Sequence, residues 1–136
     1  MEFLKAFIAG FVSTLTIHQG MLALLYAAGF WPKPAFPMSP TAPFRVPAVI
    51  SLAFWGGLWG IALWLFIREA TDLHYWTLAA VLGSLGPTLV ALFVVLPLKG
   101  QPVAGGWNFK IIASLLISHA AWGLGVALLM QLMASL

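Results

Sequence analysis

Residues Tyr75–Leu98 have the sequence YWTLAAVLGSLGPTLVALFVVLPL, an uncharged stretch that decides the fold class. About 20 apolar residues in a helix cross the hydrocarbon core of a bilayer, and this stretch exceeds that length. Pro87 lies near its middle and has no backbone N–H, so the carbonyl of Gly83 loses its usual helical donor. We therefore expect a membrane-spanning helix that bends around residues 83–88.

Three further stretches are as apolar and as long, and none alternates as a strand of a β-barrel would. Because every backbone polar group in lipid needs an internal partner, each stretch is expected to be an α-helix. The sequence predicts an all-α integral membrane protein, a four-transmembrane-helix bundle with both termini on the same side. The predicted elements of this single domain, residues 1–136, are helices at about 3–30, 46–67, 76–98 and 109–135, a proline-rich loop at 31–45 and a glycine-rich loop at 99–108.

The composition supports this class and excludes others. Hydrophobic residues make up 62% of the 136 residues and charged residues 7%, against about 25% charged residues in a soluble domain. Six Lys and Arg residues are too few for the clustered cations that bind nucleic acid. The chain has no cysteine, which excludes disulfides, thiolate metal sites and cysteine nucleophiles. The first apolar run exceeds the roughly 7–15 residues of a signal-peptide core, and we expect a retained helix.

The proline-rich loop contains three large apolar side chains, Phe36, Met38 and Phe44, and the glycine-rich loop contains Trp107. Closely spaced prolines deter helix, so the first loop should be stiff and extended. These four side chains are candidates for docking a partner. The interpretation that we favour is simpler, namely a lid that shields the helix ends.

Basic residues are divided unequally between the two ends of the predicted bundle. The positive-inside rule places the end with more Lys and Arg in the cytoplasm. Loops 31–45 and 99–108 are therefore predicted to be cytoplasmic. The residues behind this prediction are Lys33, Arg45, Lys99 and Lys110 beside the loops, against Lys5 and Arg68 at the other end.

A weak repeat relates the two halves of the chain. Trp59-Gly60 matches Trp122-Gly123 and Gly20 matches Gly83, at an offset of 63 residues. A duplicated helical hairpin would explain it, but we favour chance similarity between apolar segments. Small residues four apart recur in all four helices, which indicates close packing within a bundle.

Two histidines are predicted to lie at similar depth in the bundle. At 1.5 Å per residue, His18 is about 20 Å from Trp31 and His119 is about 16 Å from Asn108. Both positions fall near the middle of a bilayer, where an ionisable residue is costly and indicates a functional site by default. The other residues predicted in this polar layer are Thr14, Gln19, Ser84, Pro87, Thr88 and Ser118.

Several interpretations of the layer differ in what the histidines do. His18 and His119 could ligate a haem b iron from two sides, as in four-helix b-type cytochromes. They could hold a metal ion, although a complete site needs further ligands and none is predicted. They could line a path for a proton or small solute along the third helix. The simplest interpretation, which we favour, is interhelical hydrogen bonding worth about 0.6 kcal/mol per bond, and no cofactor is predicted.

Motifs of known catalytic chemistry do not occur. The chain has no HExxH or GxSxG and no pair of carboxylates within an apolar stretch. Ser118 and His119 are adjacent on a helix and therefore point in different directions. We predict that the protein is not an enzyme.

Three segments carry a resemblance: FPMSPTAPFRVP at residues 36–47, PLKGQPVAGGW at 97–107 and AWGLG at 121–125. They resemble small, mostly uncharacterised four-helix inner-membrane proteins of proteobacteria, over nearly the whole chain. The resemblance implies the architecture and a bacterial inner membrane, and no activity or site residue. We expect a non-enzymatic accessory or scaffolding subunit of a larger inner-membrane complex, or a homo-oligomer. Its partners would be lipid, other membrane subunits or itself, and the alternative is a ligand-handling bundle that uses the polar layer.

Overall fold

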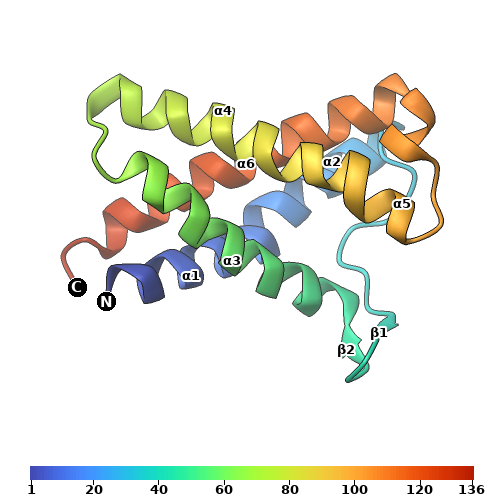
Figure 1. The fold of residues 1–136 in the computed structure, drawn as a ribbon, viewed down its shortest axis with the longest axis horizontal. Coiled ribbons are helices and arrows are strands. Elements are labelled where there is room, and N and C mark those ends of the chain that lie inside the picture. Colours follow the sequence, from blue (N-terminus) through green and yellow to red (C-terminus); the bar gives the residue numbers. More distant parts are fainter.

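The computed structural model describes residues 1–136 and contains four long helical segments that lie side by side (Figure 1). The segments Glu2–Ala27, Ala48–Ile67, Asp72–Leu98 and Phe109–Met133 are each long and apolar enough to cross a membrane. Both termini lie at one end of the bundle, together with the turn between the second and third segments (Figure 1). The prediction of a bundle of four apolar helices is confirmed.

The first and third segments each contain a stretch of π-helix. The first consists of α1 (Glu2–Ser13), η1 (Thr14–His18) and α2 (Gln19–Ala27), and the third of α4 (Asp72–Val90), η2 (Ala91–Val95) and α5 (Leu96–Leu98). Such π segments are often found at functional sites. The irregularity expected at Pro87 therefore lies one turn later, in η2, because α4 continues through the proline.

Helix ends differ from the predicted bounds by a few residues. The first segment stops at Ala27, and Gly29 with φ of 81° takes the left-handed conformation that terminates many helices. The second segment, α3 (Ala48–Ile67), begins after Pro47. The fourth segment is α6 (Phe109–Met133). Asn108 is its N-cap, because its side-chain oxygen accepts hydrogen bonds from N–H groups of the first turn.

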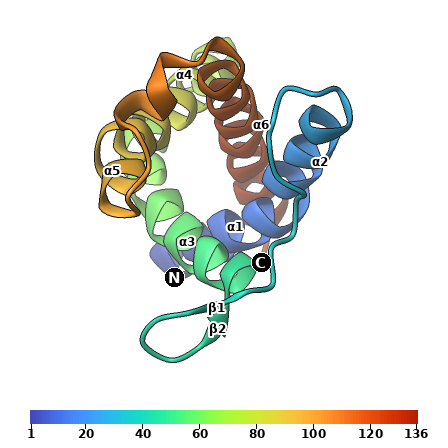
Figure 2. The same ribbon diagram turned by 90° about the vertical axis from the view of Figure 1, so that its right-hand side faces the viewer.

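The two long loops differ in how they pack. In the first, β1 (Pro40–Thr41) pairs with β2 (Val46–Pro47) in an antiparallel ladder that projects from the bundle (Figures 1 and 2). In the second, the 3-10 helix η3 (Val103–Trp107) buries Ala104 completely against Leu92 and Leu115. The glycine-rich loop is therefore packed onto the helices.

The helices associate as two hairpins with the same close crossing. The most extensive contacts are those of α1 with α3 and of α4 with α6. A Cβ atom on Gly60 would lie 2.9 Å from the Cα of Gly10 and would also meet the carbonyl of Ala6. A Cβ on Gly123 would likewise meet the Cα of Gly83, at 3.1 Å, and the carbonyl of Ala79. These contacts are made by two equivalent sets, namely Ala6, Gly10 and Gly60 in the first hairpin and Ala79, Gly83 and Gly123 in the second.

This equivalence corrects the repeat that we matched in the sequence. Gly83 corresponds to Gly10 and not to Gly20, which has no atom within 4 Å of an added Cβ. The first helices of the hairpins are thus offset by 73 residues and the second helices by 63, because the loop at 28–47 is ten residues longer than the loop at 99–108. No single offset therefore aligns both helices of the two hairpins.

The two hairpins meet along one closed seam and one open seam. The closed seam joins α1 to α6, where Ser13 Oγ donates to the carbonyl of Trp122 at 2.9 Å and the Trp122 indole donates to the carbonyl of Gly10 at 3.3 Å. The open seam is the corresponding boundary between α3 and α4, two helices that make few contacts with each other. A groove of about 130 Å³ lies there, lined by Trp59, Ala62, Leu63, Phe66, Leu82, Gly83, Gly86, Pro87 and Trp122.

Candidate functional site

The structure brings His18 and His119 together in the interior. Their rings stack with centroids 5.1 Å apart and planes inclined by 22°. His18 is the last residue of η1 and His119 lies in α6, so the pair joins the two hairpins. The similar depth that the sequence predicted for the two side chains is what allows this contact.

Gln19 fixes the first imidazole and ties it to the long loop. Its side-chain amide nitrogen lies 3.1 Å from Nδ1 of His18, and its carbonyl oxygen accepts the backbone N–H of Phe36 at 2.8 Å. Gln19 is fully buried, so both halves of its amide are paired within the protein. The conformation of the proline-rich loop is thereby linked to the histidine pair.

Thr88, in the first helix of the same hairpin, fixes the second imidazole. Its hydroxyl lies 2.8 Å from Nδ1 of His119. Thr88 follows Pro87 in α4 and is 1% exposed. Each ring is therefore held at Nδ1 by a buried polar side chain, and the two Nε2 atoms remain for other interactions.

The Nε2 edges of the rings are not sealed within apolar packing. Ser114 Oγ is the one buried side-chain polar atom that lacks a hydrogen-bond partner. The Nε2 atoms of His18 and His119 have no hydrogen-bond partner in the protein either. If they were fully enclosed, they would also be buried polar atoms without a partner, and only Ser114 Oγ is one. The two Nε2 atoms are therefore not completely enclosed, although His18 is only 8% exposed.

The remaining residues of the predicted layer bond mainly to backbone. Thr14 donates to the carbonyl of Gly10, Ser84 to that of Leu116 in α6, and Ser118 to that of Leu115. Pro87 lines the groove of the open seam. These side chains support helix packing around the pair and do not face it as ligands.

Sequence reasoning missed the link formed by Ser13 and Trp122. Both residues are buried, and their hydrogen bonds close the seam between α1 and α6. The AWGLG segment and the position of Ser13 one residue before Thr14 were visible in the sequence. The signal was hidden because a tryptophan in an apolar helix is ordinarily interpreted as lipid-facing or core.

The stacked arrangement does not fit a haem held between the two histidines. Axial ligands approach an iron from opposite faces of the macrocycle, so their rings lie end to end with the haem between them. The rings of His18 and His119 instead face each other at 5.1 Å, which leaves no space for a macrocycle. No group of three or more His, Asp or Glu side chains comes together as a metal site either.

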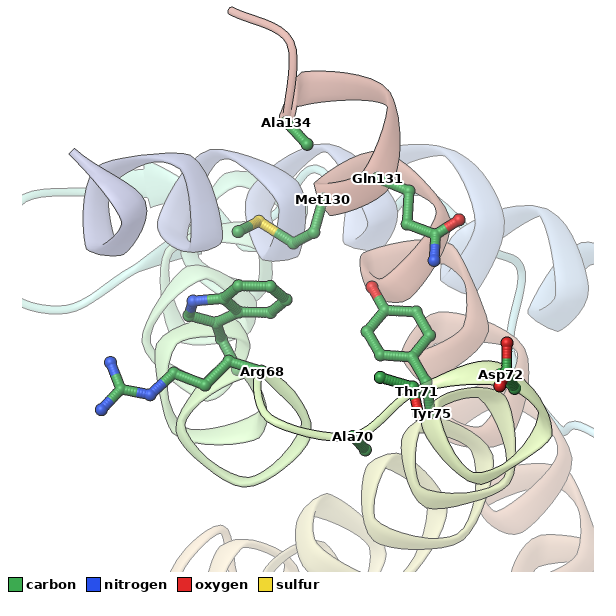
Figure 3. Close-up of a pocket in the computed structure, with 9 residues that line it drawn as sticks. Arg68, Ala70, Thr71, Asp72, Tyr75, Met130, Gln131 and Ala134 are labelled. Atoms are coloured by element: carbon green, nitrogen blue, oxygen red, sulfur yellow. The ribbon is translucent and has the colours of Figure 1, made fainter.

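A larger cavity of about 290 Å³ lies at the end of the bundle that carries the termini (Figure 3). The Tyr75 hydroxyl is already engaged, since it donates to the carbonyl of Ala127 at 2.6 Å. The Arg68 guanidinium points away from Tyr75 and Gln131 (Figure 3) and pairs with Glu2 at 3.3 Å. Thr71, Asp72 and Gln131 also line the cavity, and all three are exposed at the end of the bundle. We take the histidine pair as the stronger candidate site, because ionisable side chains in the interior of such a bundle are costly.

The predicted docking side chains lie at the surface of the two loops. Phe44 is 84% exposed at the tip of the β1–β2 hairpin, and Met38, Phe36 and Trp107 are also exposed. Trp107 packs against Phe93 of η2, with ring centroids 5.9 Å apart, whereas Phe44 projects away from the helices. The hairpin leaves an apolar tip available for contact.

Comparison of the chain with models of known protein families, with curated proteins and with solved structures finds no match.

Proposed function

We propose that the protein is a non-enzymatic integral membrane protein that binds a small molecule at the His18–His119 pair. The observation that carries the proposal is the free edge of both rings, because each Nδ1 is engaged, while each Nε2 has no partner in the protein and is not completely enclosed. Imidazoles that served only to join helices would be expected to have their buried nitrogens paired within the protein. Ionisable side chains inside a membrane bundle are costly, which favours a role for this pair.

The link through Gln19 gives the binding site a route to the surface. A ligand that moved the His18 ring would disturb the bond to Gln19 and, through it, the backbone of Phe36. Occupancy would then alter the projecting loop, which is the part of the chain best placed to touch another protein. Binding and partner contact are in this way compatible functions of one bundle.

Oxidation of the imidazoles by hydroxyl radicals, which attack the ring carbons whichever nitrogen carries the proton, tests this proposal in the intact protein. His74 is exposed in the first turn of α4 and serves as the internal reference. We expect His18 and His119 to be modified in the folded bundle, as read by peptide mass spectrometry, more slowly than His74 but well before unfolding. If both react only after unfolding, the pair is a helix-joining element and the proposal fails.

A second candidate function is that of an accessory or scaffolding subunit, or a homo-oligomer, and it rests on the apolar hairpin tip at Phe44. We place this subunit in a bacterial inner membrane with loops 31–45 and 99–108 cytoplasmic. A photo-crosslinking residue at Phe44, with Lys33 of the same loop as the matched position, tests the docking. Crosslinks to a membrane protein or a second copy from position 44 but not 33 would support it. Equal lipid adducts from both positions would contradict it.

Cysteine labelling decides the orientation, because the native chain has no cysteine. Ser39 lies in the first loop and Ser135 beside the other end of the bundle. Labelling of Ser39→Cys by a membrane-impermeant reagent only after cell lysis, with Ser135→Cys accessible in intact spheroplasts, is the expected result.

A further inference from the structure

The hydrogen bonds fix which nitrogen of His18 carries the proton. The amide nitrogen of Gln19 is a donor only, and the Gln19 oxygen is assigned as acceptor because it receives the Phe36 N–H. Nδ1 of His18 must therefore accept a hydrogen bond, so it carries no proton. The neutral ring then bears its hydrogen on Nε2, at the free edge.

The same reasoning applies to His119. The Thr88 hydroxyl is buried and has His119 Nδ1 as its hydrogen-bond partner. If Thr88 accepted from the ring, its own hydrogen would be left unpaired in the interior, at the cost of about 1–3 kcal/mol for a buried unsatisfied group. The satisfied arrangement has Thr88 donating to Nδ1, and His119 also bears its hydrogen on Nε2.

The pair thus presents two N–H donors and no lone pair at its free edges. A metal ion needs the lone pair of an imidazole nitrogen, so this arrangement disfavours a cation. An anion would lack a compensating charge, because each ring is neutral and the basic side chains lie at the bundle ends and loops. A neutral oxygen acceptor satisfies both donors without either cost.

We infer that the ligand of the His18–His119 pair is a membrane-dissolved molecule with a carbonyl oxygen, of the quinone type, and that it enters through the open seam between α3 and α4. This inference rests on the proposed binding function. The lining of the groove in that seam includes Trp122, one helical turn from His119, and Pro87, the residue before Thr88. Its volume of about 130 Å³ is below the roughly 300 Å³ of an enclosed site, so a single ring would enter while its tail stayed in lipid.

The tautomers are tested directly by long-range ¹⁵N–¹H NMR of the full-length protein in nanodiscs. We expect His18 and His119 to show the Nε2–H pattern. A Nδ1–H tautomer at either ring would overturn the inference, because that ring would then offer a lone pair at its free edge.

The ligand class is tested with decylubiquinone, titrated into phosphatidylcholine nanodiscs and followed by quenching of tryptophan fluorescence. We expect a saturable component that is about tenfold weaker in His18→Phe and in His119→Phe, since each loses one hydrogen bond. His119→Gln keeps an amide donor and should retain binding, and His74→Phe is the matched control. Gly86→Leu fills the groove, because a Cβ there lies 3.2 Å from the Trp59 ring, and should slow association at least tenfold.

The outcomes separate the inference from the proposed function. Linear quenching that is the same in every variant overturns the quinone-type ligand. If Zn²⁺ but not decylubiquinone protects His18 and His119 from hydroxyl radicals, the binding site stands and the ligand class is wrong. If neither probe binds and the two rings resist oxidation by hydroxyl radicals, both proposals fail. An unchanged association rate in Gly86→Leu refutes entry through the open seam.

Discussion

Gly123→Ala is the most informative single test of the packing, because the structure shows what its added methyl group would meet. The new Cβ would approach the carbonyl of Ala79 and lie 3.1 Å from the Cα of Gly83. Both are backbone atoms, so no side chain can rotate away and the two helices must separate. Overpacking of this kind costs about 1–3 kcal/mol, and we place this case at the upper end because the obstacle is backbone.

Gly20→Ala is the matched control. It makes the same substitution inside a helix where nothing lies within 4 Å of the new methyl group. Alanine is favoured over glycine in helices by about 0.8 kcal/mol, which stabilises the control and offsets part of the cost in Gly123→Ala. We therefore expect a net loss of about 2 kcal/mol for Gly123→Ala, a gain of about 0.8 kcal/mol for Gly20→Ala, and a gap of about 3 kcal/mol between them.

The assay is reversible unfolding in mixed micelles of mild detergent and dodecyl sulfate, followed by circular dichroism. Gly60→Ala should cost about as much as Gly123→Ala, because its Cβ would lie 2.5 Å from the carbonyl of Ala6 in the equivalent crossing. If Gly123→Ala proves as stable as Gly20→Ala, the close crossing of α4 and α6 is wrong. If Gly60→Ala and Gly123→Ala differ by more than about 2 kcal/mol, the two hairpins are not equivalent.

Three further substitutions test the polar contacts. Gln19→Leu removes the acceptor for the Phe36 N–H, and we expect hydrogen exchange of that amide to accelerate about tenfold; an unchanged rate would mean that Gln19 does not hold the loop. Ser13→Ala loses the bond to α6 and should lower the free energy of unfolding by about 0.6 kcal/mol. An unchanged free energy of unfolding would show that this bond is not formed. Gly86→Ser places a hydroxyl on α4 at the position equivalent to Ser13, facing Trp59; spin labels on α3 and α4 should then move closer together, and an unchanged separation would refute the equivalence of the two seams.

The four helices were predictable because their length is set by the apolar thickness that a spanning helix must match. The observed helices Ala48–Ile67 and Phe109–Met133 begin and end within about two residues of the predicted ranges 46–67 and 109–135. The small-residue spacing around Gly60 and Gly123 also predicted close crossings. It could not say which helices cross, because Ala6 and Ala79 look alike as sequence and only the fold pairs each with its own partner.

The candidate site was predictable only in part. Helical rise placed His18 and His119 at similar depth, and that was enough to bring them to one level of the bundle. Rise along the axis does not fix the rotation of a helix, so the stacking of the rings and the choice of Thr88 as partner could not be derived. The bond from the Phe36 N–H to Gln19 depends on the path of an irregular loop, for which the sequence carries no periodic signal.

The difference between the two seams follows from one pair of equivalent positions. Ser13 in the first hairpin and Gly86 in the second occupy the same place relative to the close crossings, and each faces the tryptophan of the opposite hairpin. Where the residue is serine, a hydroxyl bonds across the seam and the indole of Trp122 reaches the carbonyl of Gly10. Where it is glycine, no such bond forms, and a groove remains beside Trp59. The two equivalent hairpins are therefore closed against each other on one side and open on the other. The open side borders Pro87, and the next residue, Thr88, is the one that holds His119.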